Sequence, residues 1–141
     1  PGVTAASAAA AQFGFPLTHR GESRRLLICT ATAGGGGLVE VARRSVGADT
    51  TLALYMARDQ VRDVSDQLMA DGWPGCTPAI AVESAGHREA RGVPATLETL
   101  AAAIDAAKPT GPVVILIGEV TARASIASFA DTSPPQQRAA S

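Results

Sequence analysis

The chain has few cysteines, few aromatic residues and no long apolar run, and each shortage excludes a class of protein. Cys29 and Cys76 lie far apart and without metal-ligand spacing, which argues against a disulfide scaffold or a zinc site. No apolar run reaches the about 18 residues of a membrane span, and the N-terminus lacks the pattern of a signal peptide. We therefore expect a cytoplasmic protein with reduced thiols and no membrane partner.

The chain also has no large excess of charge of one sign, because its formal net charge is only −1. A chain this close to neutrality has no general attraction to nucleic acid, so no nucleic-acid partner is expected. Lysine occurs once, at Lys108, whereas arginine accounts for all the other cationic side chains. Arginine suits the recognition of carboxylates, but a GC-rich coding sequence would give the same bias and explains it better.

What is present is an alternation of strand-length apolar runs with helical patterns, in a chain of 141 residues. Strands are expected at 25–31, 50–56, 78–83 and 112–118, and helices at 4–12, 38–44, 59–71 and from Thr96 to Lys108. The extended segment 84–93 is too short for a helix and predicts an antiparallel partner. We expect an α/β fold, a three-layer αβα domain with a mixed, mostly parallel sheet.

Composition places the end of the folded domain near residue 120. From Thr121 onward Ala, Ser, Pro and Gln predominate, and this composition is typical of a disordered segment. We therefore expect one domain over 1–120 and a disordered tail over 121–141.

The first twenty residues carry the most distinctive pattern. A Pro-Gly turn precedes Thr4, whose hydroxyl can cap a helix of alanines with almost no side-chain bulk. Such a helix lets a ligand or another segment approach its backbone closely. A polar loop containing Thr18, His19 and Arg20 then follows.

General motifs of catalysis are weak. The run Gly34–Gly37 sits between an expected strand and helix, but Glu40 stands where a dinucleotide loop needs its third glycine, so a flexible connection is favoured. His19 and His87 show no triad ordering, and surface or hydrogen-bonding roles suit them better. Met56 follows a buried strand, where open α/β sheets bind ligands, although a methionine there is more often part of the core.

The residues themselves resemble a known family. The segment Pro1–Ala11 followed by Phe15–Gly21 is similar to the second-half signature of uroporphyrinogen-III C-methyltransferases, in the tetrapyrrole methylase superfamily. Shorter matches follow in order at 54–56, 78–83, 96–97 and 115–120. The Pro-Gly-Val-Thr-Ala and Pro-Leu-Thr-His-Arg sequences are the specific part of the match.

This resemblance implies methyl transfer from S-adenosyl-L-methionine to C2 and C7 of uroporphyrinogen III, giving precorrin-2 for sirohaem and cobalamin. It implies a homodimer and a cleft between two α/β domains, of which this chain is the C-terminal one with Pro1 at the hinge. By the same match, the cofactor contacts are Thr4, Ala5, Met56 and Ala85. Thr18, His19 and Arg20 are expected to meet carboxylates of the tetrapyrrole substrate.

The resemblance also has limits. The family's glycine-rich loop and proposed acid–base residues precede the part that matches, so no catalytic residue is assigned and the chain alone is expected to be inactive. Ala57 replaces the usual glycine after Tyr-Met, and only Arg91 matches the family's Arg-Gln-Arg. Methylation of a later precorrin, or a non-catalytic binding or dimerisation module, therefore remains an alternative.

Overall fold

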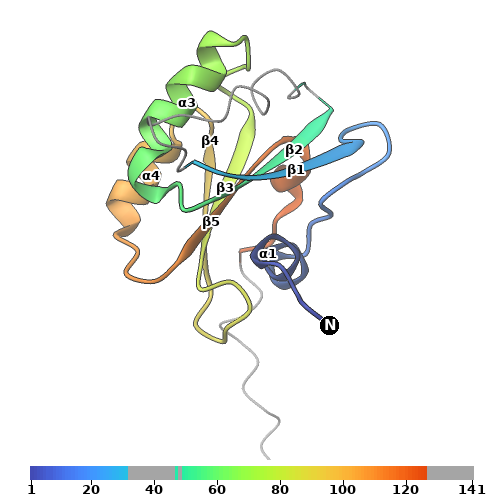
Figure 1. Cartoon of the computed structure of the whole chain (residues 1–141), viewed down its shortest axis with the longest axis vertical. Coiled ribbons are helices and arrows are strands. Elements are labelled where there is room, and N and C mark those ends of the chain that lie inside the picture. Colours follow the sequence, from blue (N-terminus) through green and yellow to red (C-terminus); the bar gives the residue numbers. More distant parts are fainter. Residues whose placement is uncertain (32–46, 48, 127–141) are drawn as a thin grey trace, which may run out of the picture.

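The computed structural model describes residues 1–31, 47 and 49–126. A five-stranded sheet lies between two layers of helices (Figure 1). In chain order the elements are α1 (Ala5–Phe13), β1 (Arg25–Thr30), β2 (Thr50–Tyr55), η1 (Arg58–Gln60), α3 (Val61–Ala70), β3 (Pro78–Glu83), β4 (Arg91–Thr96), α4 (Leu100–Ala107), β5 (Val113–Ile117) and η2 (Glu119–Arg123). The expected glycine connection at 34–37 and helix at 38–44 lie outside the described residues.

The strand order is β1-β2-β5-β3-β4, which confirms the α/β class and the mixed sheet. The expectation that most strands would be parallel is wrong: among the strands that the structure describes, only β1 and β2 pair in parallel, and the other three pairings are antiparallel. The reason is that β5 inserts between β2 and β3 antiparallel to both, while a short loop rather than a helix joins β3 to β4. In consequence β1, β2 and β3 all end at one edge of the sheet, which we call the strand-end edge.

Alternate side chains of the central strands face the two helical layers. Leu52, Leu54, Ile115 and Ile117 are fully buried in the core beneath α3 and α4. Ala53, Ile80, Val82 and Leu116 are fully buried on the opposite face, beneath α1. Figure 1 shows α3 and α4 together on one side of the sheet and α1 on the other. Truncating a buried leucine here would cost about 2–5 kcal/mol, because packing is close on both faces.

The alanine-rich composition of α1 lets this helix lie close against the sheet. Ala6 and Ala9 are both 0% exposed. Thr4 caps the helix as predicted, since its hydroxyl accepts a hydrogen bond from the Ser7 N–H at 3.1 Å. Gly14 ends the helix in the left-handed conformation, with φ at 70°.

Thr96 does not cap a helix, contrary to the prediction. It is the last residue of β4, and its N–H donates to the hydroxyl of Thr99 at 2.9 Å. The helix α4 spans Leu100–Ala107, and its C-cap Lys108 adopts the left-handed conformation. The threonine-rich segment therefore forms a side-chain-bonded turn between strand and helix, a use of threonine that competes with capping.

The ordered chain continues beyond the expected boundary at residue 120. The short helix η2 runs to Arg123, whose side chain pairs with Glu22, and the Ser125 N–H donates to the Phe13 carbonyl at 2.8 Å. The start of the expected tail, 121–125, therefore contacts the domain. The rest of the expected tail, 127–141, lies outside the described residues.

Candidate cofactor site at the strand-end edge

The first turn of α1 is joined directly to the end of β2. The hydroxyl oxygen of Tyr55 accepts a hydrogen bond from the backbone N–H of Ala6 at 3.0 Å. Ala5 is half-buried and packs against the same apolar cluster as Tyr55. Thr4 and Ala5 therefore lie beside the strand-end edge, and sequence reasoning had not identified Tyr55 as the residue that places them there.

Met56 follows Tyr55 and turns out of the sheet. Its φ is 53°, a left-handed conformation that is uncommon for a side chain of this size, and the residue is 67% exposed. It lines a groove of about 350 Å³, which we call the Met56 groove, together with Arg58, Asp59, Gln60, Gly111, Pro112 and Val113. Met56 is therefore not a core residue, which was the alternative that the sequence left open.

Ala85 lies at the same edge, just after the end of β3. It packs against the cluster that also contains Ala5 and Tyr55. Gln12 fastens this loop to α1, because its Oε1 accepts from the Gly86 N–H at 2.7 Å and its Nε2 donates to the His87 carbonyl at 2.8 Å. The four residues predicted to bind the cofactor are thus brought to one edge of the sheet by contacts between segments distant in sequence.

The predicted substrate residues lie elsewhere. Thr18, His19 and Arg20 are exposed in the loop that leads into the start of β1, at the edge opposite the strand-end edge. Glu22 holds this loop, since it pairs with Arg123 of η2 and lies 3.7 Å from Nδ1 of His19. The hydrogen bond from Arg123 lowers the pKa of Glu22. The structure does not bring these three residues together with Met56 and Ala85.

Glu83 is a further residue at the strand-end edge that the sequence did not single out. Its carboxylate accepts hydrogen bonds from the N–H groups of Thr110 and Gly111, each at 2.6 Å, and from Arg91 Nη2 at 2.8 Å. These donors, the Gly111 N–H foremost, hold the pKa of this carboxyl below its ordinary value of 4.5. No signal in one sequence links Glu83 to residues 27 and 28 positions away.

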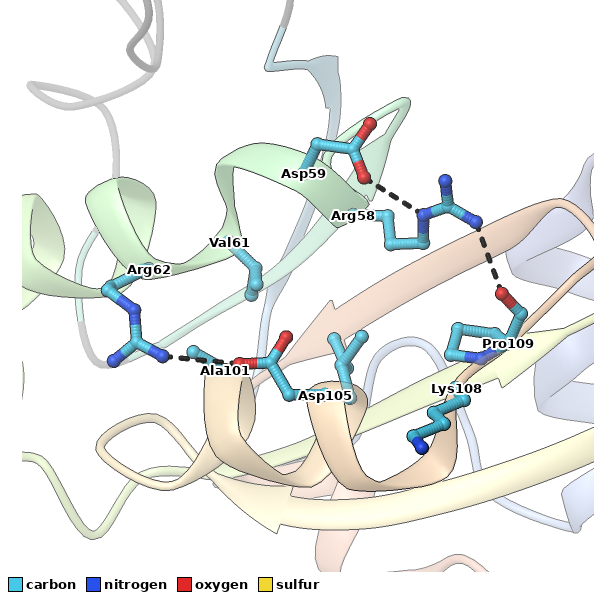
Figure 2. Close-up of a pocket in the computed structure, with 9 residues that line it drawn as sticks. Arg58, Asp59, Val61, Arg62, Ala101, Asp105, Lys108 and Pro109 are labelled. Carbon is cyan, nitrogen blue, oxygen red and sulfur yellow. Dashed lines mark hydrogen bonds and ion pairs between the residues drawn. The ribbon is translucent and has the colours of Figure 1, made fainter.

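A second groove, of about 490 Å³, lies between α3 and α4 on the outer face of the sheet. Figure 2 shows the contacts made by its two arginines: Arg58 bonds to Asp59 and to the Pro109 carbonyl, and Arg62 pairs with Asp105 across the two helices. Pairs this exposed stabilise a fold by little, about 0–1 kcal/mol. We interpret this groove as a solvated junction between helices.

The Met56 groove has features that an adenosine group needs. Met56 offers exposed, polarisable apolar surface. Gln60 also lines the groove, and its Oε1 is buried with no hydrogen-bond partner among the residues that the structure describes. By contrast, no group of three or more His, Cys, Asp or Glu side chains in the described ranges could hold a metal ion.

Fold and site together define an α/β domain that presents small residues and an exposed methionine at the ends of its strands. The family model for Tetrapyrrole (Corrin/Porphyrin) Methylases matches residues 1–101. The chain belongs to this family, and the resemblance stated from its motifs is confirmed.

Individual relatives agree with this assignment. The chain is 41% identical over 122 residues to the S-adenosyl-L-methionine-dependent uroporphyrinogen III methyltransferase of Arabidopsis thaliana, covering 85% of this chain and 33% of that protein. It is 33% identical to the uroporphyrinogen-III C-methyltransferase of Paracoccus denitrificans, covering 97% of this chain and 46% of that protein. The chain therefore spans less than half the length of these two curated relatives.

Solved structures show the same fold. The uroporphyrin-III C-methyltransferase of Thermus thermophilus in complex with S-adenosyl homocysteine matches with a TM-score of 0.66 and 30% identity, over 86% of this chain and 52% of that one. A cobalt precorrin-4 methyltransferase matches with a TM-score of 0.72 at 24% identity, which is a likeness of fold. Over the described residues, no helix has both the length and the apolar character to cross a membrane.

Proposed function

We propose that this chain is the C-terminal half of an enzyme that methylates uroporphyrinogen III at C2 and C7 to give precorrin-2, with S-adenosyl-L-methionine as methyl donor. The observation that supports this most is the location of Thr4, Ala5, Met56 and Ala85 at the same edge of a domain that belongs to the tetrapyrrole methylases. The bound cofactor would supply an electrophilic methyl group on its sulfonium.

The residues of this chain would bind and orient the cofactor. Met56 would pack on the adenosine, and the small side chains of Ala5 and Ala85 would let the ligand reach the backbone around them. Thr4 fixes the first turn of α1, so it would hold Ala5 in place as well as contact the ligand itself. Gln60 joins this set as a polar residue that lines the Met56 groove.

The proposal includes a split site, in which an N-terminal half supplies the remaining cofactor contacts and the groups that act on the substrate. It is supported by the share of its relatives that the chain spans, 33% and 46% of the first two. The chain alone would then be inactive. Two free thiols, Cys29 and Cys76, fit a reducing compartment such as the cytoplasm, and a homodimer is part of the proposal on the strength of the resemblance.

Calorimetry with S-adenosyl homocysteine tests the binding site. We expect the full-length enzyme to bind this ligand, and the chain of 141 residues alone to bind it more weakly or not at all. No binding by the full-length enzyme would contradict the proposal. Equal binding by the two proteins would instead show that this domain carries the whole site.

Met56→Ala tests the residue at the centre of the site. The side chain is 67% exposed, so its truncation removes little from the core and should leave the unfolding free energy nearly unchanged. Covering part of this side chain with a ligand is worth roughly 1 kcal/mol, so we expect the dissociation constant to rise about fivefold. Met69→Ala is the matched control, because Met69 packs against the core and its truncation should change stability instead.

The substrate role of Thr18, His19 and Arg20 stays a prediction. Strands of six residues separate their edge from the strand-end edge by about 20 Å, at about 3.3 Å per residue. Arg20→Ala should raise the KM for the tetrapyrrole and leave the KM for S-adenosyl-L-methionine unchanged. An unchanged tetrapyrrole KM would remove Arg20 from the site.

A further inference from the structure

One carboxylate connects a wall of the Met56 groove to the end of β3 and the start of β4. Glu83 is the last residue of β3. It accepts hydrogen bonds from two consecutive backbone N–H groups, those of Thr110 and Gly111. Arg91, the first residue of β4, donates to the same carboxylate through Nε at 3.2 Å and Nη2 at 2.8 Å. Arg91 Nη2 also donates to the carbonyl of Ala107 at 2.8 Å, so the end of α4 is included.

The segments tied together in this way are those that face the proposed cofactor. Gly111, Pro112 and Val113 form one wall of the Met56 groove. Ser84 and Ala85 follow Glu83 directly, and the Ser84 N–H donates to the Pro112 carbonyl at 2.8 Å. A shift of the Glu83 carboxylate would therefore move the groove wall and the Ala85 backbone together.

The segments that contain Ser84 and Gly111 lie in close contact. A Cβ placed on Gly111 would lie 2.7 Å from Oγ of Ser84, and Ser84 itself holds a φ of 53°. A residue other than glycine at 111 would require the Ser84 side chain to rotate away. The relative position of the two segments thus depends on Gly111 allowing the approach and on Glu83 holding it.

We infer that Glu83 is a positioning residue for the cofactor site, with Arg91 as its partner, and that it acts by fixing the wall of the Met56 groove relative to Ala85. The carboxylate is well suited to this because its side chain is only 12% exposed and the shortest bonds it accepts come from a charged guanidinium and from two backbone N–H groups. Arg91, the residue that matches the family's arginine motif, is then engaged within the domain. The inference rests on the proposed function, because it assigns Glu83 to the site proposed there.

Glu83→Gln in the full-length enzyme tests the inference. The variant keeps the shape of the side chain but replaces one acceptor oxygen with a donor, so Thr110, Gly111 and Arg91 can no longer all be accommodated. We expect the dissociation constant for S-adenosyl homocysteine to rise about tenfold, equal to about 1.4 kcal/mol. Asp105→Asn is the matched control, because it also removes the carboxylate of an arginine pair, in the outer groove, and should leave this constant unchanged.

Two further readouts separate positioning from general destabilisation. Hydrogen exchange at the amides of Thr110 and Gly111 should become faster in Glu83→Gln and stay unchanged in Asp105→Asn. In steady-state assays the KM for S-adenosyl-L-methionine should rise, whereas kcat at saturating cofactor and the KM for the tetrapyrrole should stay within about twofold, since only cofactor binding is weakened.

The outcomes are distinct. If the wild-type enzyme binds the ligand and Glu83→Gln binds it equally well, the inference is wrong and the proposed function stands. If the wild-type enzyme itself does not bind, the proposed function fails. If Glu83→Gln does not fold, Arg91→Gln replaces it: it removes two of the donors to Glu83 and should weaken binding by a smaller factor, and unchanged binding in that variant would overturn the inference.

Discussion

Tyr55→Phe removes a single oxygen atom, and that atom joins the helix α1 to the end of β2. The hydroxyl accepts the Ala6 N–H at 3.0 Å, across 49 residues of sequence. Ala6 is 0% exposed, so water cannot easily replace the lost acceptor. The ring itself stays in place, because phenylalanine fills the same volume.

The expected loss of stability follows from the donor that is left behind. A buried N–H without a partner costs about 1–3 kcal/mol, and the value here should lie at the lower end because the bond is only partly buried. We therefore expect a loss of about 1–2 kcal/mol in the free energy of unfolding, measured by urea denaturation with an unchanged m-value. The affinity for S-adenosyl homocysteine should fall as well, since the hydroxyl holds the first turn of α1, and with it Ala5, at the strand-end edge.

Ser125→Ala is the control for this prediction. Ser125 is exposed, and removing its hydroxyl should change the unfolding free energy by less than about 0.5 kcal/mol. If Tyr55→Phe costs no more than this control, the hydrogen bond to Ala6 is not what holds α1 against the sheet. The account of how Thr4 and Ala5 reach the strand-end edge would then be wrong.

Three other predictions concern packing, charge and thiol reactivity. Gly92→Ala should cost about 1–3 kcal/mol of stability, because the new Cβ would lie 2.8 Å from Cε1 of Phe13. The pKa of Glu83 is lowered from 4.5 in the folded state, so the contribution of this carboxylate to stability is present above about pH 4.5. This contribution is lost as the pH falls through the folded pKa. In denaturation experiments the wild type should therefore lose more stability than Glu83→Gln between about pH 5 and pH 3. Iodoacetamide should modify exposed Cys76 before Cys29, since burial raises the pKa of the Cys29 thiol.

Each of these has an outcome that would contradict it. Gly2→Ala is the control for Gly92→Ala, since a Cβ there meets nothing within 4 Å; equal stability of the two variants would show that the ring beside Gly92 moves freely. Parallel pH profiles for wild type and Glu83→Gln would remove the carboxylate from the acid-sensitive part of the fold. Faster labelling of Cys29 would mean that β1 opens readily at its edge.

The sequence predicted helices and strands well because the signals that mark them come from residues close together in the chain. The strand Pro78–Glu83 has the bounds expected from its apolar run. The Thr4 cap depends on a hydrogen bond between residues only three positions apart. Thr96 shows where such signals mislead, because a threonine before an apolar run can equally bond to a neighbouring threonine and form a turn.

Strand direction was not predictable in the same way. The insertion of β5 between β2 and β3 depends on which strands pair in the folded chain, and the sequence of Val113–Ile117 is apolar throughout and favours neither direction. The parallel expectation failed here for this reason.

The same difference between local and long-range signals decides which residues of the candidate site could be predicted. The position of Met56 after a buried strand suggested a ligand-binding edge, and the family resemblance then supplied Thr4, Ala5 and Ala85. Tyr55 and Glu83 escaped notice because their partners lie 49, 27 and 28 residues away along the chain. Their roles come from contacts between elements, which one sequence does not reveal.

The most direct test of the central claim is methyl transfer by the full-length enzyme, with labelled S-adenosyl-L-methionine and uroporphyrinogen III. The proposal predicts methyl groups at both C2 and C7, with precorrin-2 as the product, and no transfer by the chain of 141 residues alone. No label in uroporphyrinogen III, together with transfer to a later precorrin, would contradict the proposed substrate. No transfer to any tetrapyrrole would contradict the proposed activity itself.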